Sequence, residues 1–196
     1  MTKTDLRKLF LKKRQLLSPL IQQQKAQSLL ERFLKLPLFT KSQHIAFYWP
    51  IKGEISPLPI LEKSFLAHKQ CYLPVLDNRE EKLLLFTHYQ KADLLKMNRF
   101  GILEPSLEQK APFPAKELDL VLVPLLAFDL LGHRLGMGKG YYDYTFSFLN
   151  ENRSSQLKKP FLLGLAYDEQ EATLLSTDAW DISLQGILTE SRTILI

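Results

Sequence analysis

Residues 118–143 read LDLVLVPLLAFDLLGHRLGMGKGYYD. The stretch begins with LDLVLVP (118–124), a nearly continuous apolar run of the kind expected for a parallel strand covered on both faces. Four of the eight glycines of the chain follow within nine residues, and a helix is predicted to begin near Tyr141. A strand, a glycine-rich loop and a helix in this order are typical of α/β proteins that bind ligands at the carboxyl ends of their strands.

Short apolar runs elsewhere predict further strands, and these alternate with helical stretches. The other predicted strands are residues 44–50, 70–75, 82–89, 161–167, 186–190 and 192–196. Ser56-Pro57 is expected to open a helix that ends near His68, whereas residues 104–117, with three prolines, are expected to be an irregular surface loop. The pattern predicts an α/β fold with a mainly parallel central sheet flanked by helices.

Two helices precede this region and predict an N-terminal helical hairpin. Ser18-Pro19 reads as an N-cap followed by proline at the first helical position, and the second helix runs to about Lys35. The first helix covers residues 4–17, whose apolar stripe consists of Leu6, Leu9, Phe10, Leu16 and Leu17. A chain of 196 residues is long enough for one sizeable core, so we expect a single domain over 1–196.

The composition is that of a globular protein, with 45% apolar and 24% charged residues. No run of about 18 apolar residues is present, so no membrane span is predicted. The charged N-terminus lacks the apolar centre of a secretory signal. The single cysteine, Cys71, excludes an internal disulfide and favours a reduced, cytoplasmic setting. Within QCYLPV it is interpreted as an inert packing residue.

Positive charge is concentrated at the N-terminus. Residues 1–35 hold nine Lys and Arg against two acidic residues, a net charge of +7, and the total of +5 leaves −2 for the rest. A basic segment attracts phosphates, polyanionic small molecules or nucleic acid, and a solvated helix face is the alternative that composition alone favours. No RNA-binding signature accompanies the charge, which argues against nucleic acid.

Residues 134–143, RLGMGKGYYD, predict an anion site. Closely spaced glycines let backbone N–H groups converge on an anion, and the start of a helix adds its positive end. Arg134 and Lys139 add fixed cations, and Asp143 adds a carboxylate suited to Mg²⁺. Glycine follows Lys139, so the P-loop pattern fails, and G-x-G-x-G does not match the dinucleotide fingerprint. A glycine-rich turn without a ligand is the alternative.

Residues 134–143 resemble the R-L-G-x-G-x-G-Y-Y-D signature of the 5-formyltetrahydrofolate cyclo-ligase family, and Pro124, Phe128, Asp129 and Gly132 match the residues that lead into it. Residues 3–7 resemble the N-terminal K-x-x-L-R of that family, and Arg14 matches its next basic position. Residues 48–54, YWPIKGE, are similar to its folate-binding strand and loop. Residues 101–105, 164–170 and 180–181 resemble three further elements, so the resemblance covers nearly the whole chain.

The resemblance implies a Rossmann-like fold of the NagB/RpiA/CoA-transferase type. It also implies the cyclisation of 5-formyltetrahydrofolate to 5,10-methenyltetrahydrofolate with the cofactors ATP and Mg²⁺, releasing ADP and phosphate. In this reaction the formyl oxygen is phosphorylated and N10 attacks the formyl carbon. Phosphoryl transfer asks the protein mainly for positioning and charge neutralisation, which the residues present can supply.

The residues implied by the resemblance fall into four groups. Lys139 and Arg134 would be catalytic, and Asp143 and Asp181 would bind the metal. The ATP-binding residues would be Lys3, Thr4, Asp5, Leu6, Arg7, Arg14, Arg134, Leu135, Gly136, Met137, Gly138, Lys139, Gly140, Tyr141 and Tyr142. The substrate-binding residues would be Trp49, Glu54, Met137, Gly138, Lys139, Gly140 and Tyr141.

Two positions depart from the pattern of the family. Met137 stands where tyrosine, tryptophan or arginine is common, and Trp180 precedes Asp181 where histidine or asparagine is commoner. The expected partner is a small-molecule folate, with or without a polyglutamate tail, bound by a cytoplasmic monomer that binds neither nucleic acid nor membranes. Two alternatives are an RNA-binding module and a sugar-phosphate isomerase or acyl-transfer enzyme on a related scaffold, because fold alone does not determine function.

Overall fold

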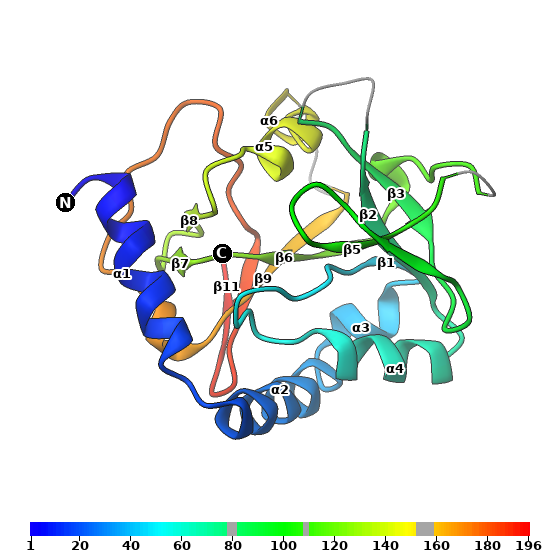
Figure 1. Cartoon of the computed structure of the whole chain (residues 1–196), viewed down its shortest axis with the longest axis horizontal. Helices are drawn as coiled ribbons and strands as arrows, with labels where there is room; N and C mark the ends of the chain where they lie inside the picture. Colours follow the sequence, from blue (N-terminus) through cyan, green and yellow to red (C-terminus); the bar gives the residue numbers. More distant parts are fainter. Residues whose placement is uncertain (78–81, 108–109, 152–158) are drawn as a thin grey trace.

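The computed structural model describes residues 1–77, 82–107, 110–151 and 159–196 (Figure 1). The strands of its main sheet are β1 (His44–Ala46), β2 (Gln70–Leu76), β3 (Leu84–His88), β6 (Leu120–Pro124), β9 (Phe161–Leu165), β10 (Gly186–Leu188) and β11 (Thr193–Leu195). They lie in the order β11-β10-β9-β6-β1-β2-β3. The five central strands are parallel, and β3 and β11 pair antiparallel at the two edges. The predicted α/β fold with a mainly parallel sheet is confirmed.

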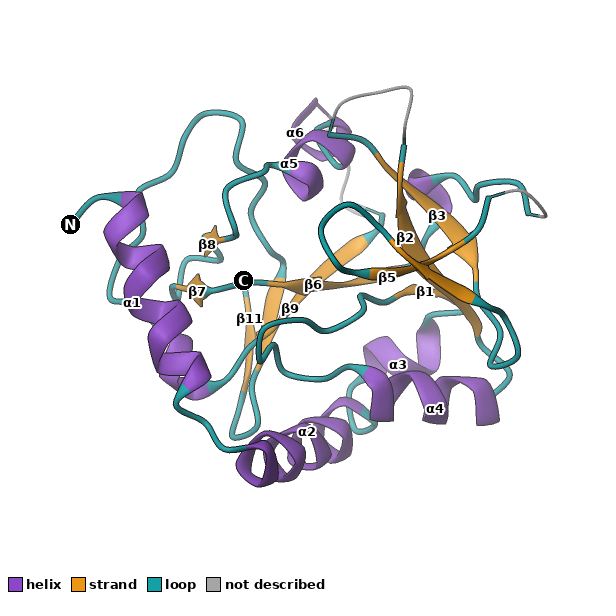
Figure 2. Ribbon diagram, viewed as in Figure 1, coloured by secondary structure: helices purple, strands orange, loops and turns teal. Residues whose placement is uncertain are grey.

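Helices cover both faces of this sheet (Figure 2). On one face lie α2 (Pro19–Phe33), the short α3 (Pro37–Lys41) and α4 (Leu58–Leu66), and Leu29 and Phe33 of α2 are fully buried there. On the other face lie α5 (Tyr141–Thr145) and α6 (Phe148–Glu151), where Phe146 packs in the same cluster as Val121 and Val123 of β6. Because β6 is covered on both faces, its sequence is apolar at successive positions. In the described part of the chain, no helix combines the length and apolar character needed to cross a membrane.

The two N-terminal helices are present and pack against different partners. Helix α1 (Lys3–Gln15) packs through Phe10 on a small ribbon formed by β7 (Ala127–Phe128) and β8 (Arg134–Leu135), whereas α2 packs on the sheet. The predicted apolar stripe of α1 is wrong at Leu9 and Leu16, which are exposed. The face of α1 that lies against the protein instead carries residues three or four positions apart. They are Lys3, Arg7, Phe10 and Arg14.

Two element predictions need correction. The strand predicted over 44–50 ends at Ala46. The next residue, Phe47, still donates its N–H to the Tyr72 carbonyl at 2.9 Å, and the chain then leaves the sheet. The irregular loop predicted over 104–117 overlaps β5 (Leu103–Pro105), which pairs with β4 (Leu95–Met97), and it contains a 3₁₀ turn at Ala115–Glu117. Strands of three residues are too short for a clear alternation of side chains to show in the sequence. Residues 108–109 of that loop lie outside the described residues.

Cys71 is fully buried in β2, as predicted, and burial raises the pKa of its thiol to about 12. Because the thiolate is the reactive form, we expect the native protein to resist iodoacetamide at neutral pH. Mass spectrometry should find the folded chain unmodified and the chain in concentrated guanidinium chloride fully alkylated. Equal labelling rates in the two conditions would contradict this prediction.

Candidate active site

A cavity of about 500 Å³ lies at the carboxyl ends of β1 and β6. From β1 the chain continues to β2 on one side of the sheet, whereas from β6 it continues to β9 and β10 on the other. Such a change of direction between neighbouring parallel strands is a switch point, where open α/β sheets bind ligands. Tyr48 and Trp49, which follow β1, line the cavity together with Pro124 and Leu125 at the end of β6. The topology therefore places a ligand site next to the glycine loop.

Most of the residues predicted for the site line this cavity, although they come from distant parts of the chain. They are Lys3, Arg7, Trp49, Glu54, Arg134, Leu135, Gly136, Met137, Gly138, Lys139, Gly140, Tyr141, Tyr142, Asp143 and Asp181. Four predicted ATP contacts, Thr4, Asp5, Leu6 and Arg14, are not in the cavity wall. Asp5 caps α1 through Thr2, Leu6 packs near Phe10, and Arg14 is buried, so these residues support the helix that carries Lys3 and Arg7.

The glycine loop, residues 136–140, joins the β7–β8 ribbon to α5. Its lead-in is fixed by the buried carboxylate of Asp129, which accepts N–H groups from Leu131, His133 and Leu175. Gly138 has a φ of 88°, in the left-handed region that favours glycine. A Cβ atom on Gly138 would also lie 3.1 Å from the guanidinium carbon of Arg7. Glycine at this position therefore permits both the loop conformation and the close approach of α1.

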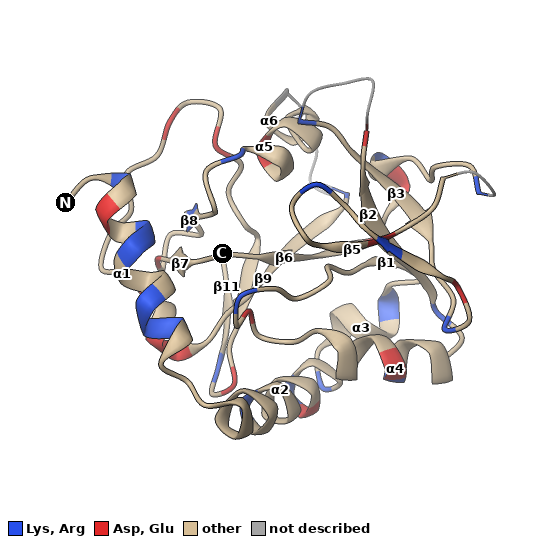
Figure 3. Ribbon diagram, in the orientation of Figure 1, with Lys and Arg blue, Asp and Glu red and all other residues tan. Residues whose placement is uncertain are grey.

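Cations from α1 and from the glycine loop itself lie around the loop. The Nε of Arg7 donates to the carbonyl oxygen of Gly136 at 3.0 Å, which ties α1 to the loop. Lys3 from the first turn of α1 and the exposed Lys139 also line the cavity. Figure 3 shows basic residues on α1, on β8 and just before α5, around this part of the molecule. The basic N-terminal segment thus contributes charge to the same cavity as the glycine loop.

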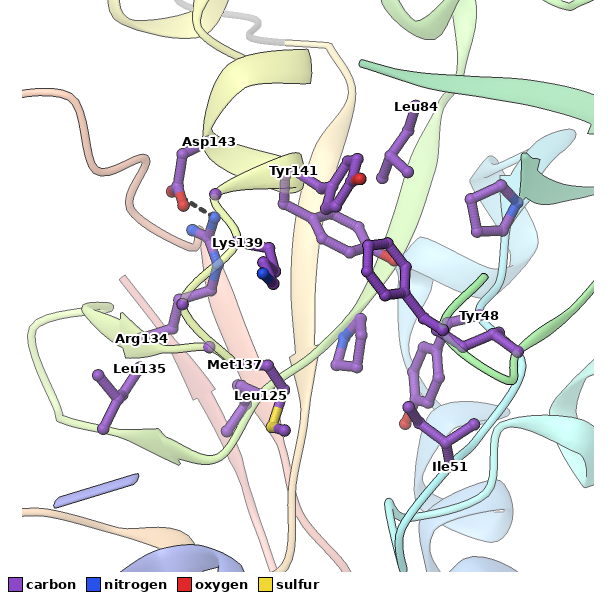
Figure 4. Close-up of a pocket in the computed structure, with 18 of the residues that line it drawn as sticks. Tyr48, Ile51, Leu84, Leu125, Arg134, Leu135, Met137, Lys139, Tyr141 and Asp143 are labelled. Carbon is purple, nitrogen blue, oxygen red and sulfur yellow. Dashed lines mark hydrogen bonds and ion pairs between the residues drawn. The ribbon is translucent and has the colours of Figure 1, made fainter. Parts of the chain in front are cut away.

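The two carboxylates predicted to bind metal also line the cavity, and each is paired with a cation. The Nη2 of Arg134 donates to Asp143 Oδ1 at 2.5 Å (Figure 4), and the N–H of Ile182 donates to the same oxygen at 3.1 Å. Lys3 Nζ lies 3.2 Å from Asp181 Oδ2 and 2.6 Å from Asp178 Oδ2. The hydrogen bond to Asp178 is the main reason that the pKa of Lys3 is raised.

This donor set fits Mg²⁺ bound together with a nucleotide. Magnesium is usually held by one or two carboxylates with substrate phosphates and waters, rather than by a cage made only of protein. Asp143 and Asp181, which both line the cavity, would supply such carboxylates. Among the described residues, no group of three or more His, Cys, Asp or Glu side chains could hold a metal by itself. The phosphates of a nucleotide would therefore complete the ligand set.

Glu54 stands in a tight turn, residues 51–54, on the β1 side of the cavity. The N–H of Ile51 donates to Glu54 Oε2 at 3.0 Å, and the N–H of Glu54 donates to the Ile51 carbonyl at 2.9 Å. Burial raises the pKa of the Glu54 carboxyl, and the nearby charge of Arg14 opposes that change. Figure 4 shows the ring of Tyr141 between the Arg134–Asp143 pair and Tyr48. The cavity therefore has a cationic side and a side with aromatic rings and the carboxylate of Glu54.

The hairpin of β4 and β5 supplies cavity residues that the sequence did not predict. Asn98, Phe100 and Ile102 line the cavity from the tip of this hairpin. The ring of Phe100 meets that of Tyr141 edge-on at 5.9 Å between centroids, and Arg99 Nη2 donates to the Tyr141 hydroxyl at 2.9 Å. The signal in the sequence was the segment NRFGI, a turn sequence whose Gly101 has a φ of 73°.

This fold and this cavity define an α/β protein that binds its ligands at the switch point of the sheet. Residues 1–190 match the 5-formyltetrahydrofolate cyclo-ligase family. The 5-formyltetrahydrofolate cyclo-ligase of Haemophilus influenzae is 38% identical over 186 residues, which cover 95% of this chain and 94% of the relative. That of Escherichia coli K12 is 35% identical over 180 residues, with 92% and 96% covered.

Solved structures agree with these sequence relatives. The NMR structure of Aquifex aeolicus 5,10-methenyltetrahydrofolate synthetase superposes with a TM-score of 0.82 at 32% identity, covering 100% of this chain and 93% of that one. A 5,10-methenyltetrahydrofolate synthetase from Mycoplasma pneumoniae gives 0.73 at 25% identity, with 97% and 99% covered. The chain belongs to the 5-formyltetrahydrofolate cyclo-ligase family and is an enzyme of the cyclo-ligase class, which confirms the resemblance found in its sequence.

Proposed function

We propose that this enzyme converts 5-formyltetrahydrofolate to 5,10-methenyltetrahydrofolate in a reaction that consumes ATP and requires Mg²⁺. The observation that carries the proposal is one cavity with two unlike sides. The glycine loop with Lys3 and Arg7 suits the phosphates of a nucleotide. Glu54 and Trp49 suit a flat, hydrogen-bonding ring. A nucleotide and a folate would therefore share one cavity, which favours transfer between them.

When bound with Mg²⁺, ATP would give its γ-phosphoryl group to the formyl oxygen and leave as ADP. N10 would then bond to the formyl carbon and lose its proton, while the carbon–oxygen bond breaks and phosphate leaves. The enzyme contributes position and charge rather than a nucleophile of its own. Backbone N–H groups of residues 136–140 would bind phosphate oxygens. Lys139 would neutralise charge on the transferred group, and Arg134, which pairs with Asp143 when no ligand is bound, would do the same once it meets the phosphates. Asp143 and Asp181 would hold the metal.

The ring system of the substrate would lie against Glu54, because its amino and ring N–H groups present adjacent donors to a carboxylate. Trp49 and Tyr141 would contact the faces or edges of the ring, which aromatic side chains do favourably. Met137 is half-exposed at the cavity wall, where a flexible thioether can adapt to a ligand. These assignments make the carboxylate of Glu54 the main anchor of the folate.

The proposal predicts that purified protein incubated with 5-formyltetrahydrofolate and Mg-ATP develops the absorbance of the methenyl product. ADP should form in equal amount, and chelation of Mg²⁺ should stop both. The measurement is a parallel assay of absorbance and ADP. If neither product appears, the proposed function is refuted; methenyl product without ADP would refute the role of ATP alone.

The basic helix favours this function over RNA binding. Arg14 of α1 is buried, and Lys3 and Arg7 line the cavity. Lys8, Lys12 and Lys13 are the other cations of α1, and they are exposed. Much of the charge on α1 is therefore used inside the molecule, so the helix offers a smaller basic surface to a polyanion than its sequence indicates.

We further propose that the enzyme works as a monomer in the cytoplasm on a small-molecule folate, with or without a polyglutamate tail. The predicted catalytic and binding residues on both sides of the cavity come together within one chain, which favours a monomer. ATP and a free, buried Cys71 both suit the reducing interior of a cell.

A further inference from the structure

Arg14 is a buried cation that lies behind the cavity wall rather than in it. Its side chain is 1% exposed. Its Nε donates to the Lys52 carbonyl at 3.1 Å, and its Nη1 donates to the Leu125 carbonyl at 3.3 Å. Its Nη2 has no hydrogen-bond partner in the described part of the protein. A buried guanidinium is costly unless its partners compensate, so its position calls for a specific role.

The partners of Arg14 centre on the turn that carries Glu54. Arg14 Nη1 lies 3.7 Å from Glu54 Oε1, while the N–H of Ile51 donates to Glu54 Oε2. One oxygen of the carboxylate is therefore held by a hydrogen bond, and the other lies at ion-pair distance from the Arg14 guanidinium. The turn also rests on the end of α1, because a Cβ atom on Gly53 would lie 3.6 Å from the carbonyl oxygen of Arg14. Arg14 thus restrains both the backbone and the side chain of the turn.

The same guanidinium connects the two sides of the cavity. Leu125, which accepts from Nη1, follows the end of β6 and lines the cavity at the start of the segment that leads to the glycine loop. At the other end of α1, Arg7 holds the glycine loop through Gly136. A single helix therefore contacts the glycine loop near its beginning and the Glu54 turn near its end.

We propose that Arg14 is a positioning residue for the folate: it acts through Glu54, whose carboxylate it holds in the orientation that receives the ring, and it makes no contact with ATP. The inference rests on the proposed function of Glu54. Pre-ordering a carboxylate in this way strengthens binding because the ligand does not have to order the side chain itself. Arg14 was expected from the sequence to contact ATP, and its burial away from the cavity assigns it this indirect role instead.

The test is a double-mutant cycle on folate affinity. Wild-type protein, Arg14→Met, Glu54→Gln and the double variant are titrated with 5-formyltetrahydrofolate without ATP, and with ATP in separate titrations, by calorimetry. Arg14→Met is expected to weaken folate binding roughly 5–50-fold in the wild-type background and less than about twofold in the Glu54→Gln background, as coupled neighbours do. ATP affinity should change less than about threefold.

Two further variants keep the test decisive. Lys12→Met removes an exposed cation from the same helix and should leave both affinities unchanged. Arg14→Lys keeps the positive charge with fewer hydrogen-bond donors, so it should fold even if Arg14→Met does not. Its loss of folate affinity should be smaller than that of Arg14→Met, and this loss should also disappear in the Glu54→Gln background. Equal losses in both backgrounds, or an equal loss of ATP affinity, would overturn the inference. Failure of the wild-type protein to bind folate would instead refute the proposed function.

Discussion

Replacing Lys139 by alanine is expected to lower kcat by about 10²–10³-fold, the usual loss when one group that stabilises developing charge is removed. Lys139 is exposed, lines the cavity and stands between Gly138 and Gly140 of the glycine loop. Its ammonium group is therefore free to meet the phosphoryl group in transfer. Since the side chain packs against little, the melting temperature should stay within about 2 °C of the wild type.

Lys8→Ala provides the matched control for Lys139. Lys8 is also an exposed lysine, it lies on α1 next to Arg7, and it is not part of the cavity wall. Its replacement removes the same charge and the same side-chain length, so kcat should stay within about twofold of the wild type. The two variants are compared by steady-state kinetics and thermal melts. Normal turnover of Lys139→Ala would show that the lysine is only surface charge.

Local patterns in the sequence were enough to predict the sheet and the glycine loop. The continuous apolar run at 120–123 follows from burial on both faces, and Gly132, Gly138 and Gly140 follow from a backbone with positive φ angles. Each of these signals depends on a few neighbouring residues. The order of the strands and the switch point come from how the chain connects them, which no local pattern encodes.

The wall of the cavity could be predicted only in part, because long-range contacts create the rest. Arg14 was expected from the sequence to contact ATP, yet its contacts are with residues 52, 54 and 125. Asp178, which pairs with Lys3, and Phe100, at the tip of the β4–β5 hairpin, stand in segments without a clear periodic pattern. Their roles depend on where those segments pack, which tertiary structure decides.

Replacing Asp143 by asparagine is expected to raise the Mg²⁺ concentration needed for half-maximal activity by at least about tenfold. Asparagine keeps an oxygen for the N–H of Ile182 but loses the charge that pairs with Arg134. Because the Arg134 side chain is nearly buried while that of Asp143 is partly exposed, we expect a loss of about 2–3 kcal/mol of stability, between the values for exposed and buried pairs. Thermal melts then separate a metal defect from a folding defect.

The pairing of charges in this cavity makes a second readout possible, independent of turnover. Arg134 and Lys3 occupy the carboxylates of Asp143 and Asp181 in the absence of ligands. When ATP and Mg²⁺ bind, the two cations would pair with the phosphates and the two carboxylates would bind the metal. ATP and Mg²⁺ should therefore each strengthen the binding of the other. Titration of ATP with and without Mg²⁺, followed by the fluorescence of Trp49 and Trp180 in the cavity wall, measures this coupling.

The effect of Mg²⁺ on ATP affinity should be strong in the wild type and nearly absent in Asp143→Asn. In this variant, one of the two side chains proposed to bind the metal no longer carries a negative charge. Asp178→Asn is the informative comparison: Asp178 lines the same cavity and pairs with the same Lys3, yet it has no assigned metal role. Its replacement leaves the Lys3–Asp181 pair intact, so the Mg²⁺ effect on ATP affinity should persist. An undiminished Mg²⁺ effect in Asp143→Asn would mean that the metal is held by other groups and that Asp143 serves only to orient Arg134.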